Sequence, residues 1–421
     1  MHTQLAPEFQ NTPEGEEAQA ILRKCVHCGF CTATCPTYQL LGDELDGPRG
    51  RIYLIKQVLE GKEPTRSTQS HLDKCLTCRN CESTCPSGVQ YGKLLDIGRH
   101  IVDQKVQRPL SERAARWALR TGMTSKAFAP AIALGRIAKP LLPTSLKDKL
   151  PAAPSAGRWP SREHARKVMM LAGCVQPAML PNINAATARV LDAIGVQTLV
   201  MPAAKCCGAV QQHLSDPHGA LARAKANIDA WWPWVEKRQI EAIISTASGC
   251  GVMVKDYGHL LRHDKDYAER AKAVSALARD LSELLPAMLP ELTERLQGKL
   301  QPQTAPLAYH PPCTLQHGQQ LRGTVETSLR QLGFDLRVSR VESHLCCGSA
   351  GTYSLLQPEI SHQLRDRKLG TLHQACNEAP PAAILSANVG CITHLQAGTQ
   401  VPVRHWIEVI DDALKAVGAE R

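Results

Sequence analysis

Two runs of four cysteines, each ending in Cys-Pro, constrain this chain more than any other feature. The first run holds Cys25, Cys28, Cys31 and Cys35, and the second holds Cys75, Cys78, Cys81 and Cys85. The spacing C-x-x-C-x-x-C-x-x-x-C-P is typical of domains with two [4Fe–4S] clusters, in which the fourth cysteine of each run binds the cluster of the other run. It predicts one cluster on Cys25, Cys28, Cys31 and Cys85, and a second on Cys75, Cys78, Cys81 and Cys35.

Zinc is the alternative occupant of closely spaced cysteines. Zinc sites typically pair two C-x-x-C units across a spacer, whereas here each run has four cysteines and ends in proline. The spacing therefore favours iron–sulfur clusters. Small residues beside the ligands, Gly29, Ser83 and Gly88, leave backbone N–H groups free to bond the cluster sulfurs and tune their potential.

The C-terminal half carries nine of the chain's 17 cysteines and repeats itself. The first copy has Cys174, the pair Cys206-Cys207 followed by Gly208, and Cys250; the second has Cys313, the pair Cys346-Cys347 followed by Gly348, and Cys391. The steps between these cysteines are 32 and 43 residues in the first copy, and 33 and 44 in the second. Such agreement indicates duplication of one structural unit.

Short apolar runs of the buried-strand type precede the cysteines of both copies. Residues 168–171 lead to Cys174, residues 241–246 to Cys250, and residues 382–387 to Cys391. Helix-like stretches such as 184–193 and 220–232 lie between them. This alternation predicts parallel α/β units, whose ligands gather beyond the carboxyl ends of the strands. Each copy is therefore expected to be a small α/β lobe with cysteines on its rim.

The repeated cysteines leave several chemistries open. Each four-thiolate set is a candidate iron–sulfur centre, a thiol site for redox chemistry, or a remnant of a metal site. The copies differ in nearby histidines, which are candidate ligands or proton donors, or merely packed. These are His310, His317, His344 and His394 in the second copy, and His213 in the first. Cys376 has no counterpart and is expected to be a buried or free thiol.

The predicted fold is multidomain, combining α+β and α/β parts. A mainly helical N-terminal domain with a ferredoxin-like core for two [4Fe–4S] clusters is expected over residues 17–107. A basic, proline-rich connector covers 108–165. Lobe 1 is expected over 166–300 and lobe 2 over 301–421, both cysteine-rich and α/β.

The connector region accounts for the net charge of +10. Residues 100–167 hold 14 Lys and Arg against four acidic residues. This basic strip is either a solvated linker or a surface for an acidic partner or anionic lipid. The aromatic content of 4% argues against nucleic acid as a partner.

No apolar segment approaches the ~18 residues of a membrane span, and the start of the chain does not resemble a signal peptide. A cytoplasmic location is therefore predicted, with peripheral attachment to the inner membrane as an option.

The combined motifs resemble the iron–sulfur subunit of bacterial glycolate oxidase. The resemblance runs along the whole chain, and the segments that carry it are 25–36, 42–52, 75–86, 246–251 and 344–353. It implies that FAD-binding partner subunits oxidise glycolate to glyoxylate. This chain would then relay the electrons to a quinone or another acceptor, within a hetero-oligomeric oxidoreductase that acts on CH–OH donors.

A wider group of redox subunits shares these features. It includes subunits of lactate-utilisation and anaerobic glycerol-3-phosphate dehydrogenase systems, and heterodisulfide reductases, which would use the cysteine pairs for thiol chemistry. In heterodisulfide reductases the cysteine-rich domain ends in C-x-x-C. Here Cys250 is followed by Gly-Val-Met and Cys391 by Ile-Thr-His, so each copy retains one cysteine of that pair. The resemblance thus does not carry their non-cubane cluster over to this chain.

Overall fold

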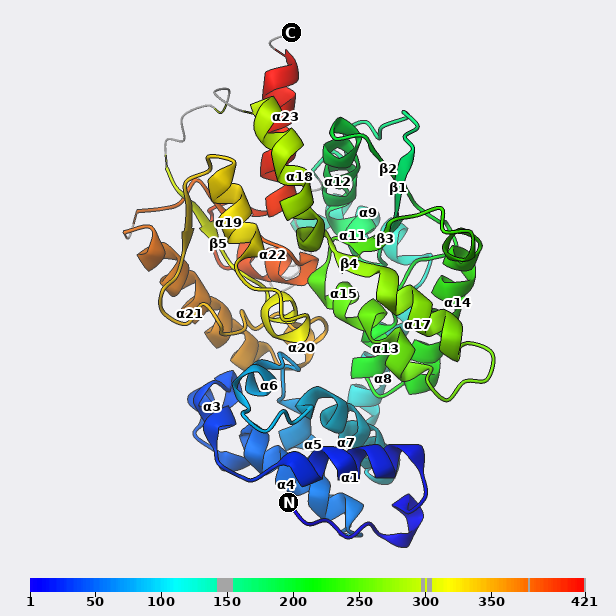
Figure 1. The fold of residues 1–421 in the computed structure, drawn as a ribbon. Helices are drawn as coiled ribbons and strands as arrows, with labels where there is room; N and C mark the ends of the chain where they lie inside the picture. Colours follow the sequence, from blue (N-terminus) through cyan, green and yellow to red (C-terminus); the bar gives the residue numbers. More distant parts are fainter. Residues whose placement is uncertain (142–153, 297–299, 301–304, 378, 420–421) are drawn as a thin grey trace.

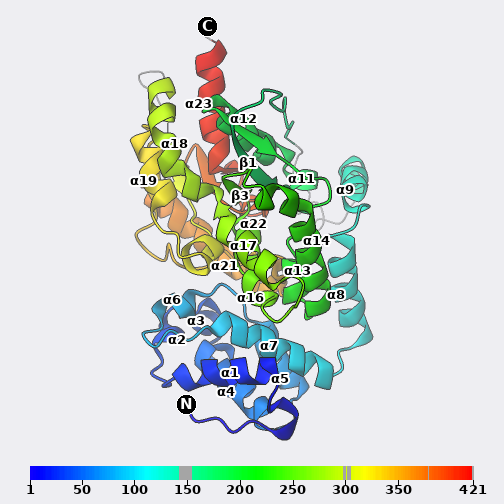
Figure 2. The same ribbon diagram turned by 45° about the vertical axis from the view of Figure 1, so that its right-hand side comes forward.

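The computed structural model describes residues 1–141, 154–296, 300, 305–377 and 379–419. Figure 1 shows a helical N-terminal domain (blue) below two α/β lobes that stand side by side. The turned view in Figure 2 shows that the same domain lies beneath both lobes. The predicted division into a helical part and two α/β lobes is confirmed at this level.

The N-terminal domain is built from helices around one apolar core. These are η1 (Pro7–Phe9), α1 (Pro13–Lys24), α2 (Phe30–Ala33), α3 (Pro36–Leu41), η2 (Glu44–Asp46), α4 (Pro48–Leu59), α5 (Arg66–Asp73), α6 (Asn80–Thr84) and α7 (Tyr91–Lys105). Apolar faces of α1, α4 and α7 meet in the core, where Leu22, Ile55 and Leu94 are buried. Proline stands in the first turn of α1, α3 and α4, where its missing N–H costs no hydrogen bond. The short helices α2 and α6 each carry the last part of one cysteine run.

The predicted connector is helical over much of its length rather than a solvated linker. Helix α8 (Leu110–Gly122) and α9 (Phe128–Ile137) run up the outside of lobe 1, followed by η3 (Lys139–Leu141) (Figure 2). Ion pairs join α8 to both of its neighbours, because Arg116 pairs with Asp73 of the N-terminal domain and Arg120 with Asp216 of lobe 1. Residues 142–153 of the connector lie outside the described part of the chain.

Lobe 1 contains a four-stranded parallel sheet in the order β2-β1-β3-β4. Its elements are β1 (Arg166–Leu171), α11 (Gln176–Met179), α12 (Pro181–Ala193), β2 (Val196–Leu199), α13 (Ala209–His213), α14 (Pro217–Glu236), β3 (Ala242–Ser245), α15 (Ser248–Lys255), α16 (Tyr257–Leu260), α17 (Ala268–Leu277), β4 (Ala278–Asp280) and α18 (Leu281–Leu296). The central strands are buried on both faces, as expected of a parallel sheet between helices.

Lobe 2 repeats this topology, with a parallel sheet in the order β6-β5-β7-β8. Its elements are β5 (Leu307–Tyr309), η4 (Thr314–Gly318), α19 (Thr324–Gln331), β6 (Leu336–Val338), α20 (Tyr353–Leu356), α21 (Pro358–Ala375), β7 (Ala383–Ser386), α22 (Val389–Gln396), β8 (Val403–His405) and α23 (Trp406–Ala419). The equal strand orders agree with the duplication predicted from the cysteine spacing. The three predicted strands became β1, β3 and β7, and the two predicted helices became α12 and α14.

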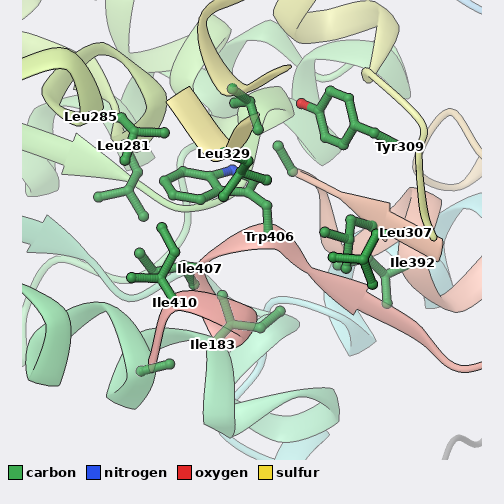
Figure 3. Packing of buried hydrophobic residues seen from close by; sticks show 14 of the residues in the cluster. Ile183, Leu281, Leu285, Leu307, Tyr309, Leu329, Ile392, Trp406, Ile407 and Ile410 are labelled. Atoms are coloured by element: carbon green, nitrogen blue, oxygen red, sulfur yellow. The ribbon is translucent and has the colours of Figure 1, made fainter. Parts of the chain in front are cut away.

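The two lobes exchange their last helices. The last helix of lobe 1, α18, packs on α19 of lobe 2, and the last helix of lobe 2, α23, packs on α12 of lobe 1. Figure 3 shows the result: Ile183 of α12, Leu285 of α18, Leu329 of α19 and Trp406 of α23 meet in one apolar cluster. The lobes therefore share a core.

Polar contacts reinforce this exchange of helices. The Arg189 guanidinium donates two hydrogen bonds, of 2.9 and 2.7 Å, to the Asp411 carboxylate of the other lobe. His405 of β8 donates from Nε2 to the carbonyl oxygen of Thr246 in lobe 1 at 3.0 Å. The backbone N–H of Ser248 donates to the carbonyl oxygen of Ala387 at 3.1 Å. The relative position of the lobes is thus fixed by both apolar and polar contacts.

Candidate iron–sulfur sites

The four thiols predicted for the first cluster converge on one hollow of the N-terminal domain. Cys25, Cys28, Cys31 and Cys85 all line a hollow of about 30 Å³, which Cys81 also reaches. Cys85 comes from the second run, so the structure brings the exchanged cysteine to the three of the first run. Burial raises the pKa of Cys31 to about 11, and the neighbouring thiols of Cys25, Cys85 and Cys28 act in the same direction.

The thiols predicted for the second cluster also lie together. Burial raises the pKa of Cys78 and of Cys81 well above the usual value, and the thiols of Cys75 and Cys35 raise both further. Cys35 belongs to the first run, so the exchange is reciprocal. We call Cys25, Cys28, Cys31 and Cys85 the first thiol set, and Cys75, Cys78, Cys81 and Cys35 the second thiol set.

The backbone around both sets adopts the same unusual conformation. His27 and Thr77 hold equivalent places in the two runs and have φ angles of 55° and 54°. Gly29 and Arg79 are likewise equivalent, with φ angles of 86° and 59°. Left-handed residues turn backbone N–H groups toward the enclosed thiols, and the N–H of Thr77 lies 3.4 Å from Cys75 Sγ. At Arg79 a non-glycine residue bears a cost of about 1 kcal/mol in this conformation, which indicates that the loop geometry is required.

A buried arginine lies beside the second thiol set. Arg51 is inaccessible to solvent, donates to Thr37 Oγ1 at 3.1 Å, and lies 3.6 Å from the Asp46 carboxylate. Thr37 in turn lies 3.3 Å from Cys35 Sγ. Sequence patterns do not reveal this role of Arg51, although Asp46 and Arg51 both lie in the segment 42–52 that carries part of the family resemblance. A buried cation at this point offsets the negative charge of four thiolates.

The four cysteines of lobe 1 face one another at the carboxyl edge of its sheet. Hydrogen bonds from the thiols of Cys174 and Cys207 lower the pKa of Cys206. The thiol of Cys207 is also hydrogen-bonded to that of Cys250. The N–H of Gly208, which has a φ angle of 94°, points at Cys206 Sγ from 3.5 Å. Cys206 and Cys207 are buried, whereas Cys174 and Cys250 are partly exposed.

In lobe 2 the corresponding cysteines are all buried. Cys313 Sγ lies 3.8 Å from Cys346 Sγ, and the thiols of Cys347 and Cys391 are hydrogen-bonded to each other. His310 joins this group, since one nitrogen of its ring and the sulfurs of Cys347 and Cys391 all lie within 4.8 Å of one another. Burial lowers the pKa of His310 well below its usual value. The neutral ring is the form that binds metals.

Lobe 2 docks directly on the loop of the second thiol set. Tyr353 donates its hydroxyl to the carbonyl oxygen of Lys74 at 2.9 Å, and Asn80 donates to the carbonyl oxygen of His344 at 3.4 Å. Cys78 packs against the cluster that contains Cys313 and Cys346. Burial raises the pKa of Cys78, and the charge of Cys313 raises it further. The second thiol set and the lobe 2 thiols are therefore immediate neighbours.

A cavity of about 1250 Å³ lies between the N-terminal domain, α8, α9 and both lobes. Thiols of three groups reach it, namely those of Cys75, Cys78, Cys174, Cys207, Cys250, Cys313, Cys346 and Cys391. Most of its wall is apolar, so charges near the cysteines are poorly screened by water. None of the helices in the described part of the chain is long and apolar enough to cross a membrane.

The remaining candidate residues have ordinary roles in the structure. His213 lines the cavity 3.7 Å from the Asp96 carboxylate. His394 is buried and bonded to Ser361, and His344 is half-buried near the docking surface. Cys376 is a buried member of the shared core, as expected.

The donor chemistry of both thiol sets suits iron–sulfur clusters. Burial raises the pKa of Cys31, Cys78 and Cys81 and so disfavours their bare thiolates, a cost that bound iron offsets. Cysteine sulfur is the ligand that these clusters use, and backbone N–H groups and a buried arginine are available to stabilise the added charge. The residues present therefore fit such groups.

Comparisons with known proteins agree with this geometry. Residues 21–89 match the 4Fe-4S dicluster domain family, and residues 168–255 and 307–396 each match the cysteine-rich domain family. The lactate utilization protein A of Geobacillus thermodenitrificans is 25% identical over 58% of this chain and 98% of its own length.

Two further relatives extend along nearly the whole chain. The probable glycolate oxidase iron–sulfur subunit of Bacillus subtilis is 30% identical, over 94% of this chain and 92% of its own length. The glycolate oxidase iron–sulfur subunit of Escherichia coli is 54% identical, over 99% of this chain and 100% of its own length. This chain belongs to the family of glycolate oxidase iron–sulfur subunits.

Proposed function

We propose that this chain is the electron-transfer subunit of a glycolate oxidase complex. Glycolate is oxidised to glyoxylate on an FAD-binding partner subunit, and the two electrons leave through this chain toward a quinone or another acceptor. Membership of the glycolate oxidase iron–sulfur family supports the complex and its substrate. An iron–sulfur cluster supplies one-electron transfer when bound.

The first thiol set holds one [4Fe–4S] cluster and the second thiol set holds the other. The observation that carries this proposal is the reciprocal exchange, in which Cys85 joins the first run and Cys35 joins the second. Exchange of the last ligand keeps two clusters close, and closeness is what sequential electron transfer requires. The residues of this chain contribute the thiolates, the inward N–H groups and the exclusion of water.

A further iron–sulfur centre lies in at least one lobe. Lobe 2 is the stronger candidate, because its thiols are buried and adjoin Cys78 of the second thiol set. The electron path then leads from the first thiol set to the second and on to the lobe 2 thiols. In this proposal residues 17–107 hold both N-terminal clusters, 108–165 form the connector, and 166–300 and 301–421 each hold one cysteine set of the lobes.

Metal analysis of the anaerobically purified chain tests the clusters. We expect about eight irons and as many acid-labile sulfides from the N-terminal domain, and additional iron from a lobe centre. Cys28→Ser should lower the iron content and change the EPR signals, whereas Cys376→Ala, a change at a thiol outside all sets, should not. A colourless protein with stoichiometric zinc would overturn the proposal.

Activity measurements test the division of labour within the complex. Glycolate should reduce a dye through this chain only after the flavoprotein partner is added. Glycolate-driven dye reduction by this chain alone would contradict the proposed complex.

Peripheral attachment to the cytoplasmic face of the inner membrane is a separate part of the proposal. Helices α8 and α9 expose the apolar side chains of Leu110, Trp117, Leu134 and Ile137, with basic residues such as Arg113 between them. Apolar and basic side chains on one surface suit anionic lipid headgroups. Salt screens such binding, so a high-salt wash should release the chain from membranes. Recovery in the supernatant at low salt would contradict attachment.

A further inference from the structure

One histidine of lobe 2 is buried without any polar partner. His310 is 1% exposed, and both of its ring nitrogens lack a hydrogen-bond partner among the described residues. A buried imidazole normally bonds at least one neighbour, because an unsatisfied polar atom loses its hydration without compensation. The other buried histidines of the lobe follow that rule. His317, for example, lies 3.0 Å from Ser83 Oγ and 2.9 Å from the carbonyl oxygen of His344.

The ring of His310 is placed against thiols. One of its nitrogens and the sulfurs of Cys347 and Cys391 lie within 4.8 Å of one another. The thiol of Cys346 is hydrogen-bonded to that of Cys347, and the sulfur of Cys313 lies 3.8 Å from the sulfur of Cys346. The imidazole of His310 therefore adjoins a connected group of four buried thiols. Nitrogen and sulfur donors that converge without bonding other groups are what a transition-metal site provides.

Lobe 1 has no such imidazole at the equivalent position. The register of the sheets places Leu171 opposite Ser245 in lobe 1, and one step along the same pairing places His310 beside Ser386 in lobe 2. Both residues also stand three positions before the first cysteine of their lobe. The duplication thus offers an internal comparison: the same scaffold carries four thiols with leucine in one copy and four thiols with histidine in the other.

A second difference points to the same place. Lys368 of α21 is 3% exposed, lies near the lobe 2 thiols, and donates to the carbonyl oxygen of Glu342 at 2.5 Å. A Cβ added at Gly348 would meet Ser361, and one added at Gly208 would meet Ala220, so Ser361 and Ala220 hold equivalent positions in the two lobes. Lys368 follows Ser361 by seven residues, and Asn227 of lobe 1 follows Ala220 by seven, so Asn227 is the equivalent of Lys368. A buried ammonium needs nearby negative charge. An anionic metal–thiolate centre in lobe 2 meets that need.

We propose that His310 is a ligand of an iron–sulfur centre in lobe 2, together with thiols of Cys313, Cys346, Cys347 and Cys391. The inference rests on the proposed iron–sulfur function and adds the mixed nitrogen–sulfur coordination. Neutral imidazole in place of an anionic thiolate raises the reduction potential of an iron–sulfur centre. Lobe 2 is then a better electron acceptor than an all-thiolate site, and it adjoins the second thiol set from which electrons arrive.

Selective isotope labelling tests the ligand directly. The full chain is prepared anaerobically with either ¹⁴N- or ¹⁵N-histidine and examined by pulsed EPR. We expect a nitrogen coupling to a paramagnetic iron centre that changes with the isotope. The coupling should disappear in His310→Cys, which keeps the lobe iron because thiolate replaces imidazole, and the midpoint potential of that centre should fall. His310→Leu, which copies lobe 1, should lose the lobe iron.

The matched control is His317→Leu, a buried histidine of the same lobe whose ring nitrogens are both occupied. It should retain the coupling and the iron. Absence of a histidine coupling in the parent chain, or its persistence in His310→Cys, would overturn the inference. An iron content no higher than that of the two N-terminal clusters would also overturn it, as would zinc bound in lobe 2. Each of these results leaves the N-terminal clusters intact, whereas absence of all iron would overturn the proposed function itself.

Discussion

Lobe 1 and lobe 2 have the same strand order and the same four cysteines, yet their cysteines lie in different surroundings. Thiols of both lobes reach the central cavity, but two of the lobe 1 thiols, Cys174 and Cys250, are partly exposed. The lobe 2 thiols are buried, adjoin Cys78, and have His310 and Lys368 for neighbours. The sheet topology thus determines where the thiols gather, and the neighbouring side chains determine what they can hold. The two copies are therefore expected to differ in function.

Removal of the paired thiols should separate the lobes most clearly. We expect Cys346→Ser with Cys347→Ser to reduce glycolate-dependent electron transfer in the reconstituted complex more than about 100-fold, beyond the 10–100-fold typical of residues outside the ligand shell. Cys206→Ser with Cys207→Ser should have a smaller effect, because Cys78 of the second thiol set packs against the cluster that contains Cys313 and Cys346 of lobe 2. EPR signals of the N-terminal clusters serve as the control. Equal losses in both variants would contradict the comparison.

Two buried tryptophans distinguish the shared core from the core of one lobe. Trp406 lies in the cluster built by both lobes, whereas Trp231 lies in a cluster of lobe 1 alone. Either change to alanine should cost about 3–5 kcal/mol, because a large cavity is left. Hydrogen exchange should show lost protection in both lobes for Trp406→Ala, and in lobe 1 only for Trp231→Ala. Confinement of the Trp406→Ala effect to lobe 2 would mean that the lobes are energetically independent.

His405, at the end of β8, and Asp280, at the end of β4, should make contributions to folding stability that change with pH in opposite directions. Burial lowers the pKa of His405 to about 3, although the hydrogen bond that the ring donates to the carbonyl oxygen of Thr246 acts in the opposite direction. Protonation would also break the bond that the ring accepts from the Ile407 N–H. The unfolded state then binds a proton between pH 6.5 and 3 that the folded state does not, so stability is lost as pH falls through this window. Burial raises the pKa of Asp280, the lobe 1 equivalent, so its contribution declines as pH rises above 3.8.

Urea unfolding at pH 7.5 and pH 5 measures this difference. His405 should account for about 2 kcal/mol of lost stability at pH 5, at 1.36 kcal/mol for each pH unit below 6.5. His405→Gln, which retains a donor for Thr246, should remove most of that pH dependence. Asp280→Asn, which removes the opposing contribution, is the control and should not reduce the loss. An unchanged slope in His405→Gln would show that other groups control the acid sensitivity.

The smallest expected difference concerns two arginine–carboxylate pairs of similar geometry. Arg189 and Asp411 join the lobes with side chains that are 19% and 4% exposed, whereas Arg166 and Glu241 lie within lobe 1 and are 52% and 46% exposed. Asp411→Asn should cost about 2 kcal/mol, since the remaining arginine is partly buried, and Glu241→Gln less than about 1 kcal/mol. Urea midpoints check both. Equal costs would mean that burial does not set the strength of these pairs.

The sequence was sufficient for the features that depend on spacing. Cysteine intervals led to both thiol sets and to the duplication, and apolar runs led to β1, β3 and β7. Helices α8 and α9 were missed because the region reads as a basic, proline-rich connector, although polar and apolar residues alternate at helical spacing in α8. Four histidines near the lobe 2 cysteines could not be ranked, because only the fold reveals that His317 has hydrogen-bond partners while His310 has none.

Other features depend on contacts that local patterns do not encode. Arg51 and Lys368 are charged residues, which patterns assign to the surface, yet both are buried beside thiols. The pairing of Arg189 with Asp411 joins residues 222 positions apart. Such pairs follow from the packing of the two lobes and not from either repeat by itself.

The exchange of α18 and α23 means that the repeats behave as the two halves of an internal dimer with approximate twofold symmetry. A chain cut between the lobes would leave each half with a bare apolar helix and a groove that fits the helix of the other. Separately produced halves should therefore reassociate or aggregate rather than persist as monomers. The shared core thereby holds the cysteine edges of the two lobes at a fixed separation.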